Sequence, residues 1–183
     1  MKHTLLAFLL LTSGILFAQH TIEAAEGFTH DIGIMVSMLE DLKVRITEQV
    51  QDLSQSETDF EFDGKANSIG ALTMHLVATE AYYQIETLEG RQLTAEEQKI
   101  FGIGGELNDT SKKQLKEKPI QYYLDLWNKV REKTLTGLKT KDDAWFASDI
   151  DEGINYHWAW YHVLEHSANH MGQIALVKNR FPN

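Results

Sequence analysis

The amino-acid sequence predicts an all-α fold, a four-helix bundle with a long crossover connection between the second and third helices. Three observations lead to this fold class. Apolar residues recur at steps of three and four in four separate stretches, which is the period of amphipathic helices. No stretch shows a convincing strand pattern. The second connection is much longer than a plain up-and-down bundle needs, which indicates a crossover.

The first helix is predicted over residues 28–53, where one apolar stripe runs without a break. The stripe consists of Phe28, Ile32, Met35, Leu39, Leu42, Ile46, Val50 (or Gln49) and Leu53. Residues 54–68, SQSETDFEFDGKANS, then interrupt the period with polar and turn residues. Asn67 or Ser68 supplies an N-cap for the second helix, which we expect over residues 69–87. Its inward positions are Ile69, Leu72, Leu76 and Tyr83.

The crossover connection begins at Gly90 and is weakly patterned. Thr94 and Glu97 match a capping box and predict a short helical turn over residues 94–101. The rest of this segment gives no clear periodic signal. We therefore expect it to cross the bundle rather than to form a further long helix.

The third helix begins within residues 110–119, because a proline is accepted in the first turn of a helix but not deep inside it. Its apolar stripe ends at Leu138. Residues 139–153 are expected to form a loop of ordinary length for a helical bundle. Asn155 then caps a fourth helix that extends nearly to Arg180.

The length of 183 residues suits one domain with a substantial core. Residues 1–18 combine a lysine, an apolar run and a small residue before a polar stretch, which is typical of a secretory signal peptide. The apolar run is too short to span a bilayer comfortably, so no stable membrane anchor is expected after cleavage. The bundle is assigned to residues 19–183, and the protein is predicted to be exported to the periplasm or out of the cell.

Composition limits the classes of function. The formal net charge is −10 at pH 7, which argues against nucleic acid as a partner, because its phosphate backbone is bound through clustered lysine and arginine. The chain has no cysteine, so it has neither a disulfide nor a thiol of its own. Any thiol chemistry must therefore come from a substrate or a cofactor.

The strongest functional signal is the stretch HVLEHSANH, which places three histidines four residues apart. The helical register puts His166 and His170 on the inward stripe and His162 at its edge. Side chains four apart on a helix lie about 5 to 6 Å apart at Cβ, so two imidazoles can converge on one ion. His75, beside the apolar positions of the second helix, is the best candidate for a third donor. The alternative is a set of core histidines without a metal.

The segments NSIGALTMHLVATE and HVLEHSANHMGQIALVKNRF together resemble the DinB superfamily, the bundles of the DinB and YfiT-like type. The resemblance covers essentially the whole chain after the signal peptide. It implies a three-histidine metal site, with one ligand at His75 and an HxxxH pair at His166 and His170. Two positions depart from the pattern, since Asn169 stands where many members have histidine and Met171 where many have arginine. Both concern substrate contacts beside the site.

The resemblance implies a divalent metal ion, with zinc or nickel as the usual choices and iron or manganese as alternatives, because the ligand set does not select among them. It also implies a metal-dependent transferase acting on low-molecular-weight thiols. Hydrolysis of an ester or amide by a water activated at the ion is a second enzymatic hypothesis. A non-catalytic bundle that binds a metal or a small ligand is the alternative. The small-molecule substrate stays open, and a homodimer is expected from the resemblance alone.

Four further residues are catalytic candidates. Gln173, three residues after His170 on the inward face, is expected to orient an imidazole or a water, or else to be a satisfied polar core residue. His162 is a candidate fourth ligand or proton shuttle, with edge packing as the simpler interpretation. Glu80 and Glu165 are candidate general bases, although their spacing from the ligands favours surface carboxylates for both.

Overall fold

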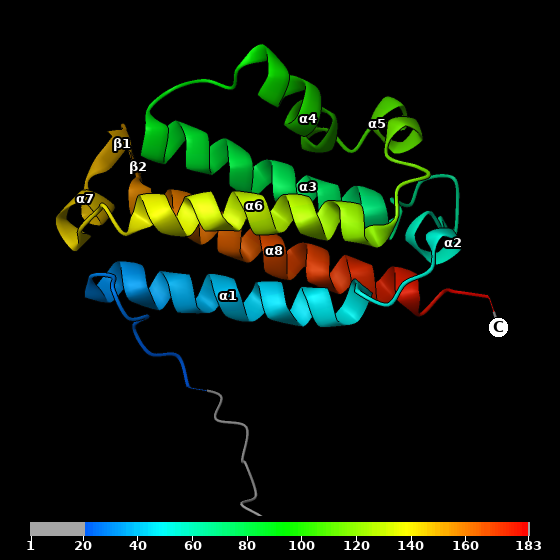
Figure 1. Cartoon of the computed structure of the whole chain (residues 1–183), viewed down its shortest axis with the longest axis horizontal. Helices are drawn as coiled ribbons and strands as arrows, with labels where there is room; N and C mark the ends of the chain where they lie inside the picture. The colour runs from blue at the N-terminus through cyan, green and yellow to red at the C-terminus, as the bar shows by residue number, and fades with distance from the viewer. Residues whose placement is uncertain (1–20, 183) are drawn as a thin grey trace, which may run out of the picture.

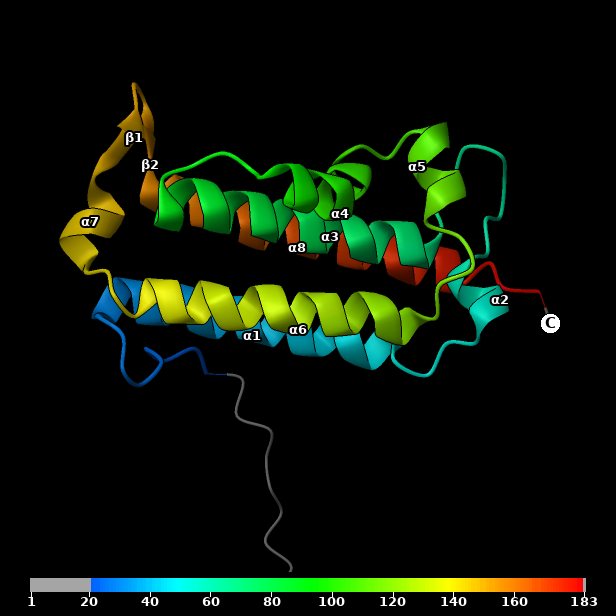
Figure 2. The same cartoon turned by 45° about the horizontal axis from the view of Figure 1, so that its top comes forward.

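The computed structural model describes residues 21–182 and shows a bundle of four long helices (Figure 1). These are α1 (His30–Val50), α3 (Ile69–Gln84), α6 (Ile120–Leu138) and α8 (Tyr156–Lys178). Figure 2 shows them as two layers, with α3 beside α8 and α6 beside α1. The predicted all-α bundle is therefore confirmed. The predicted signal peptide, residues 1–18, lies outside the described residues.

The crossover connection between α3 and α6 runs along the outside of α3 and contains two helices of its own (Figure 1). A π-helical segment, η1 (Ile85–Glu89), continues α3 and is followed by Gly90, whose φ of 65° lies in the left-handed region that favours glycine. It is followed by α4 (Ala95–Gly105) and α5 (Asp109–Gln114). The predicted helical turn over residues 94–101 is thus confirmed, but α4 extends four residues further.

The expectation for the connection between α6 and α8 is wrong. Residues 139–153, predicted as a loop, contain the short helix α7 (Asp143–Ala147) and the strand β1 (Asp149–Asp151). This strand pairs with β2 (Ile154–Asn155) in an antiparallel hairpin. Helix α7 depends on one N-cap and one buried phenylalanine, and the strands are two and three residues long. Elements this short leave no periodic pattern in a sequence.

The ends of the first helix also differ from the prediction. Helix α1 ends at Val50, three residues early, and the break that follows holds one further turn, α2 (Gln55–Thr58). Ser54 caps this turn, because its hydroxyl accepts a hydrogen bond from the backbone N–H of Glu57 while the Glu57 carboxylate accepts one from the backbone of Ser54. The capping box explains why a polar stretch becomes helical.

Helix α3 is the most enclosed element, because α6, α8 and α4 all pack against it. Its first turn is fixed by Ser68, whose side chain accepts a hydrogen bond from the backbone N–H of Ala71. Twelve of its sixteen residues are buried, and most of them are apolar or small. A helix apolar on every side belongs in a protein interior. The polar residues of α3 must therefore find their partners inside the protein.

The apolar core consists of two clusters. One joins α3 to α6 and the C-terminal part of α8 around Trp127, and the other joins α1 to α7 and the N-terminal part of α8 around Trp160. Each of these tryptophans is at most 1% exposed. Among the described helices, none is both long and apolar enough to cross a membrane.

Candidate metal centre

Three histidines meet where α3 and α8 pack together. His75 comes from α3, and His166 and His170 come from successive turns of α8. One ring nitrogen of each lies within 4.8 Å of a ring nitrogen of the other two. The ring centroids of His75 lie 4.8 Å from His166 and 4.9 Å from His170, and the two α8 rings are 4.4 Å apart. The fold thus brings together the three residues that the sequence proposes as ligands.

Hydrogen bonds hold two of the three rings. The Nδ1 of His75 lies 2.7 Å from the carbonyl oxygen of Gly104 in α4, and the Nδ1 of His170 lies 2.9 Å from Oε1 of Gln173. A carbonyl oxygen can only accept, so each Nδ1 carries the hydrogen and donates it. Each Nε2 then keeps its lone pair. Such an arrangement is usual for histidines that bind a metal through Nε2.

His166 is the third member of the cluster, and its Nε2 atom is buried with no hydrogen-bond partner among the described residues. Burial is the main cause that lowers the pKa of His166 to about 4, and the neighbouring histidines lower it further. Burial also lowers the pKa of His170, against a smaller raising effect from Gln173. Both rings are therefore neutral near pH 7, which is the state that binds a metal ion.

The residues present fit a metal ion. Buried polar atoms in native proteins are almost always hydrogen-bonded, so the unpartnered Nε2 of His166 needs an explanation. An ion bound to this nitrogen and to its two neighbours satisfies it. Three imidazoles supply three of the four positions of a tetrahedral site and leave one for a small molecule.

A cavity of about 480 Å³ lies against the histidine cluster. It is lined by Ala78, Thr79, Tyr82, Tyr83, Gln92, Leu93, Gln98, Phe101, Gly102, Gly105, Glu106, His162 and His166. Its walls therefore come from α3, α8 and the crossover, and its size suits a small molecule. Because His166 belongs to both the cluster and the cavity wall, a molecule in the cavity has access to an ion held by the histidines.

The chain matches the model of a known protein family. The mycothiol S-transferase family model matches residues 34–181, a range that contains all three histidines. The chain belongs to the mycothiol S-transferase family. This is a DinB/YfiT-like family, so the resemblance to the DinB superfamily is confirmed. No curated protein sequence matches the chain significantly.

Within this family member, His162 and Glu165 form a pair on α8. The Nδ1 of His162 lies 2.9 Å from Oε1 of Glu165, and Glu165 is exposed, as its spacing predicts. The His162 ring is stacked on Trp158, with 5.3 Å between centroids and an angle of 3° between the planes. His162 thus lies at the cavity wall next to the cluster, with its centroid 5.6 Å from that of His166.

Gln173 contacts the cluster, but from a different place than predicted. Its side chain is exposed rather than inward, because a residue three positions after His170 lies toward the edge of α8. It nevertheless reaches back to hydrogen-bond the His170 ring. The expectation that Gln173 orients an imidazole is consistent with this contact, whereas the expectation of an inward-facing side chain is wrong.

The position of Glu80 differs from the prediction. The sequence favours a surface carboxylate, whereas the side chain is buried, with 1% exposure. Oε1 accepts a hydrogen bond of 2.6 Å from Nε of Arg131, and Oε2 accepts bonds from Nη2 of Arg131 and from the Trp127 indole at 2.8 and 2.7 Å. Burial alone raises the pKa of Glu80, but the Arg131 charge and these bonds outweigh it and lower the pKa. Both oxygens are occupied, so these contacts give no support to a general-base role.

Several residues of the site have no counterpart in the sequence predictions, and Gly104 and Gln92 are two of them. Gly104 supplies the carbonyl that holds His75, and Gln92 belongs to the cavity wall from the loop before α4. The run GIGG over residues 102–105 was a usable signal, because glycine within a helix often marks a close approach between backbones. No local pattern singles out Gln92.

Proposed function

We propose that the protein is a metal-dependent thiol S-transferase whose centre is the cluster of His75, His166 and His170. The observation that carries the proposal is the buried, unpartnered Nε2 of His166 at the junction of the cluster and the cavity. Membership of the mycothiol S-transferase family supports a thiol as the substrate. Zinc or nickel is proposed as the ion, with iron and manganese as the alternatives that metal analysis distinguishes.

The reaction transfers the sulfur of a small thiol to an electrophilic carbon. The thiol loses its proton, its sulfur forms a bond to the carbon, and the bond to the leaving group breaks with its electron pair going to that group. A bound divalent ion supplies a positive charge that lowers the pKa of a thiol and so favours the nucleophilic thiolate. The three histidines hold the ion, and the cavity holds the electrophile close to it.

His162 is the proposed acceptor of the thiol proton. Its Nδ1 hydrogen is donated to Glu165, which leaves the Nε2 lone pair available at a ring that belongs to the cavity wall. Glu165 and the stacked Trp158 restrict the orientation of the ring. A base whose ring is held by a second partner in this way is a common arrangement in enzymes.

The cavity wall favours an uncharged thiol. Its polar side chains are amides and hydroxyls, such as Gln92, Gln98 and Thr79, together with the carboxylate of Glu106. No lysine or arginine occurs among the described residues that line it. Apart from the bound ion, a thiol with several carboxylates meets no cationic side chain in this wall, and it meets a like charge at Glu106.

The proposal is tested with purified protein that carries about one divalent ion per chain. Thiol consumption is followed with a panel of electrophiles, with and without a chelator, and ester and amide hydrolysis is measured in parallel. We expect thiol transfer that is lost with the ion, and a His162→Gln variant that keeps the ion but turns over at least roughly 100-fold more slowly. Hydrolysis without thiol consumption overturns the proposal, and an inert metal-loaded protein favours a non-catalytic binding bundle.

Export and homodimer formation stay predictions. Export is checked by mass spectrometry of the N-terminus of the protein isolated from its natural host, where cleavage near Ala18 is expected. The oligomeric state is checked by light scattering on the purified chain.

A further inference from the structure

We infer that Gly104 is a positioning residue, and that the crossover helix α4 holds His75 in its metal-binding orientation through the Gly104 carbonyl. The inference rests on the proposed function, because it assumes that His75 is a ligand. It adds a role for a segment that contributes no ligand of its own. The hydrogen bond spans 29 residues of sequence and is 2.7 Å long.

The first step is the chemistry of the contact. A backbone carbonyl has no hydrogen to give, so His75 must donate from Nδ1 and keep the lone pair on Nε2. Without this partner, the ring is free to turn about its side-chain bonds and to place the hydrogen on Nε2. Either change removes the lone pair from the centre of the cluster.

The second step explains why a glycine stands at residue 104. A Cβ atom built there lies 2.8 Å from the backbone oxygen of Met74, 2.9 Å from its Cγ and 3.0 Å from Cβ of Ala78. The oxygen of Met74 is part of the buried backbone of α3 and cannot move cheaply. A side chain at this position therefore pushes α4 away from α3 and lengthens the bond to His75. The neighbouring Gly105 has no atom within 4 Å of its own added Cβ, so of these two residues it is Gly104 that needs to lack a side chain.

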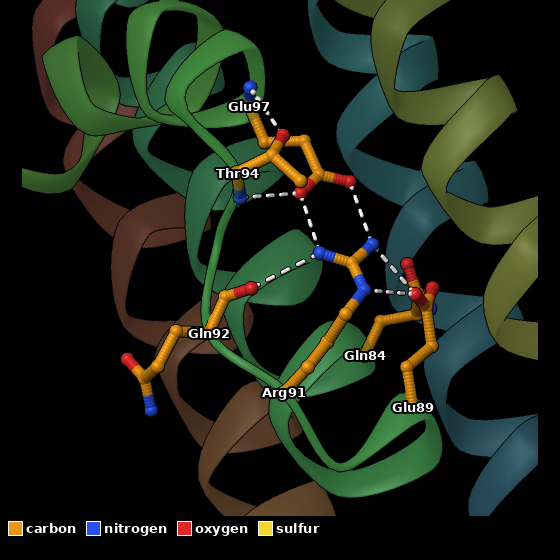
Figure 3. Close-up of polar contacts among 6 residues, drawn as sticks. All are labelled: Gln84, Glu89, Arg91, Gln92, Thr94 and Glu97. Atoms are coloured by element: carbon orange, nitrogen blue, oxygen red, sulfur yellow. Dashed lines mark hydrogen bonds and ion pairs between the residues drawn. The ribbon is translucent and has the colours of Figure 1, made fainter.

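The third step concerns the other end of α4, where Arg91 ties the helix to the end of η1 (Figure 3). Its guanidinium donates to both carboxylate oxygens of Glu97 at 2.7 and 2.9 Å, and its Nε donates to Glu89 at 2.8 Å. The Glu97 carboxylate also accepts from the backbone N–H of Thr94 in the capping box. The hydrogen bond from Arg91 is the main cause that lowers the pKa of Glu97 to about 2, so the pair stays charged. Both ends of α4 are thus attached to α3 or its continuation.

These contacts together make α4 a rigid support for the His75 ring. Loss of a hydrogen bond that orients a metal-binding histidine typically lowers metal affinity by roughly 10- to 100-fold. We expect Gly104→Ala to cause a loss of this size. Gly105→Ala is a matched control for metal affinity, because it makes the same chemical change one residue away, where an added Cβ meets no atom within 4 Å. Gly105 lines the cavity, so this control is not used for activity.

The experiment measures Zn²⁺ affinity by competition with a chromophoric chelator in the full chain and in both variants. We expect an affinity loss of roughly 10- to 100-fold in Gly104→Ala, and a value within about twofold of the parent in Gly105→Ala. The Co²⁺ absorption spectrum is expected to change only in Gly104→Ala. Unchanged affinity in Gly104→Ala, or an equal loss in Gly105→Ala, overturns the inference.

A second measurement does not depend on how Gly104→Ala folds. In the metal-free parent protein, ¹⁵N NMR of the imidazoles is expected to show the hydrogen of His75 on Nδ1. A hydrogen on Nε2 overturns the inference.

Arg91→Ala, at a half-exposed residue, is expected to give a smaller affinity loss than Gly104→Ala. If the parent protein binds no divalent ion while the NMR result holds, the proposed function fails and the positioning contact stands.

Discussion

Two polar clusters lie five residues apart on α3, and their hydrogen bonding differs. Around Glu80, each carboxylate oxygen is bonded, and Arg131 also donates to Glu40 at 2.6 Å. Around His75, two rings are held through Nδ1 while the Nε2 of His166 has no partner among the described residues. A buried cluster whose polar atoms are all hydrogen-bonded is typical of a structural role, whereas an unpartnered nitrogen between two further imidazoles fits a metal ligand.

The two clusters also differ in what their burial costs. Glu80 and Arg131 are both charged and nearly fully buried, so each depends on the other to offset the loss of water. His166 and His170 are neutral near pH 7, and burying a neutral imidazole costs much less free energy than burying a charge. Changes at the first cluster should therefore affect folding, and changes at the second should affect binding.

The largest effect is expected for Arg131→Ala, which leaves the Glu80 carboxylate buried and unpaired. The free energy of unfolding should fall by about 3–5 kcal/mol, measured by urea denaturation. Arg45→Ala is the control, because its ion pair with Asp41 is exposed and should contribute less than about 1 kcal/mol. A loss below 1 kcal/mol in Arg131→Ala would contradict a structural role for the Glu80 cluster.

His166→Ala should weaken metal binding while changing the stability of the metal-free protein little. It removes one of three ligands, so metal affinity should fall by more than the roughly 10- to 100-fold expected for a supporting hydrogen bond. The unfolding midpoint of the metal-free protein should change little, because no hydrogen bond of Nε2 is lost. Calorimetric metal titration and metal analysis check this result. His157→Ala, at an exposed histidine outside the cluster, should bind metal normally, and retained affinity in His166→Ala would reject the ligand assignment.

A smaller effect is expected for Gln173→Ala, which removes the acceptor that holds the His170 ring. Metal affinity should fall by roughly 10-fold, toward the lower end for a supporting bond, because Gln173 is exposed to water that can replace it. Gln173→Glu keeps an oxygen acceptor and should restore the affinity. Equal affinity in the parent and Gln173→Ala would show that this contact does not orient the ring.

The smallest effect concerns the pH dependence of the metal-free protein. The pKa of His166 is about 4 in the fold and 6.5 in a free histidine, so between these values the unfolded chain binds the extra proton. This contribution to stability is present above pH 6.5 and is lost as the pH falls toward 4. Screening by solvent at a half-buried ring keeps it to about 1 kcal/mol. Urea unfolding of the parent and of His166→Gln across this range should differ by this slope, and parallel curves would exclude it.

The sequence predicts the histidine cluster well because its information is local. A spacing of four puts His166 and His170 on one helix face, and the helical register brings His75 to the packed side of α3. The four long helices follow from periodicity in the same way. The burial of Glu80 is not predictable by this reasoning, because it depends on Arg131, which lies 51 residues away on α6. Glu80 is buried because this tertiary contact supplies its charged partner.

The crossover connection is also predicted only in part from local sequence patterns. Thr94 and Glu97 predict the start of α4, because a capping box is a motif of four consecutive residues. Its end at Gly105 and the contact of Gly104 with His75 depend on packing against α3, which no local pattern encodes. The short elements of residues 143–155 are missed for a similar reason, since each is stabilised mainly by its neighbours.

Because α4 covers one side of α3, the crossover connection cannot be shortened without exposing part of α3. Helix α4 covers a side of α3 that would otherwise present apolar side chains such as Met74 and Ala78 to water. Deleting residues 91–118 to obtain a minimal bundle with a tight turn would expose these apolar side chains and create a surface patch that promotes aggregation. Evolutionary or engineered trimming of the link must therefore be accompanied by polar replacements along α3, or by an external covering surface.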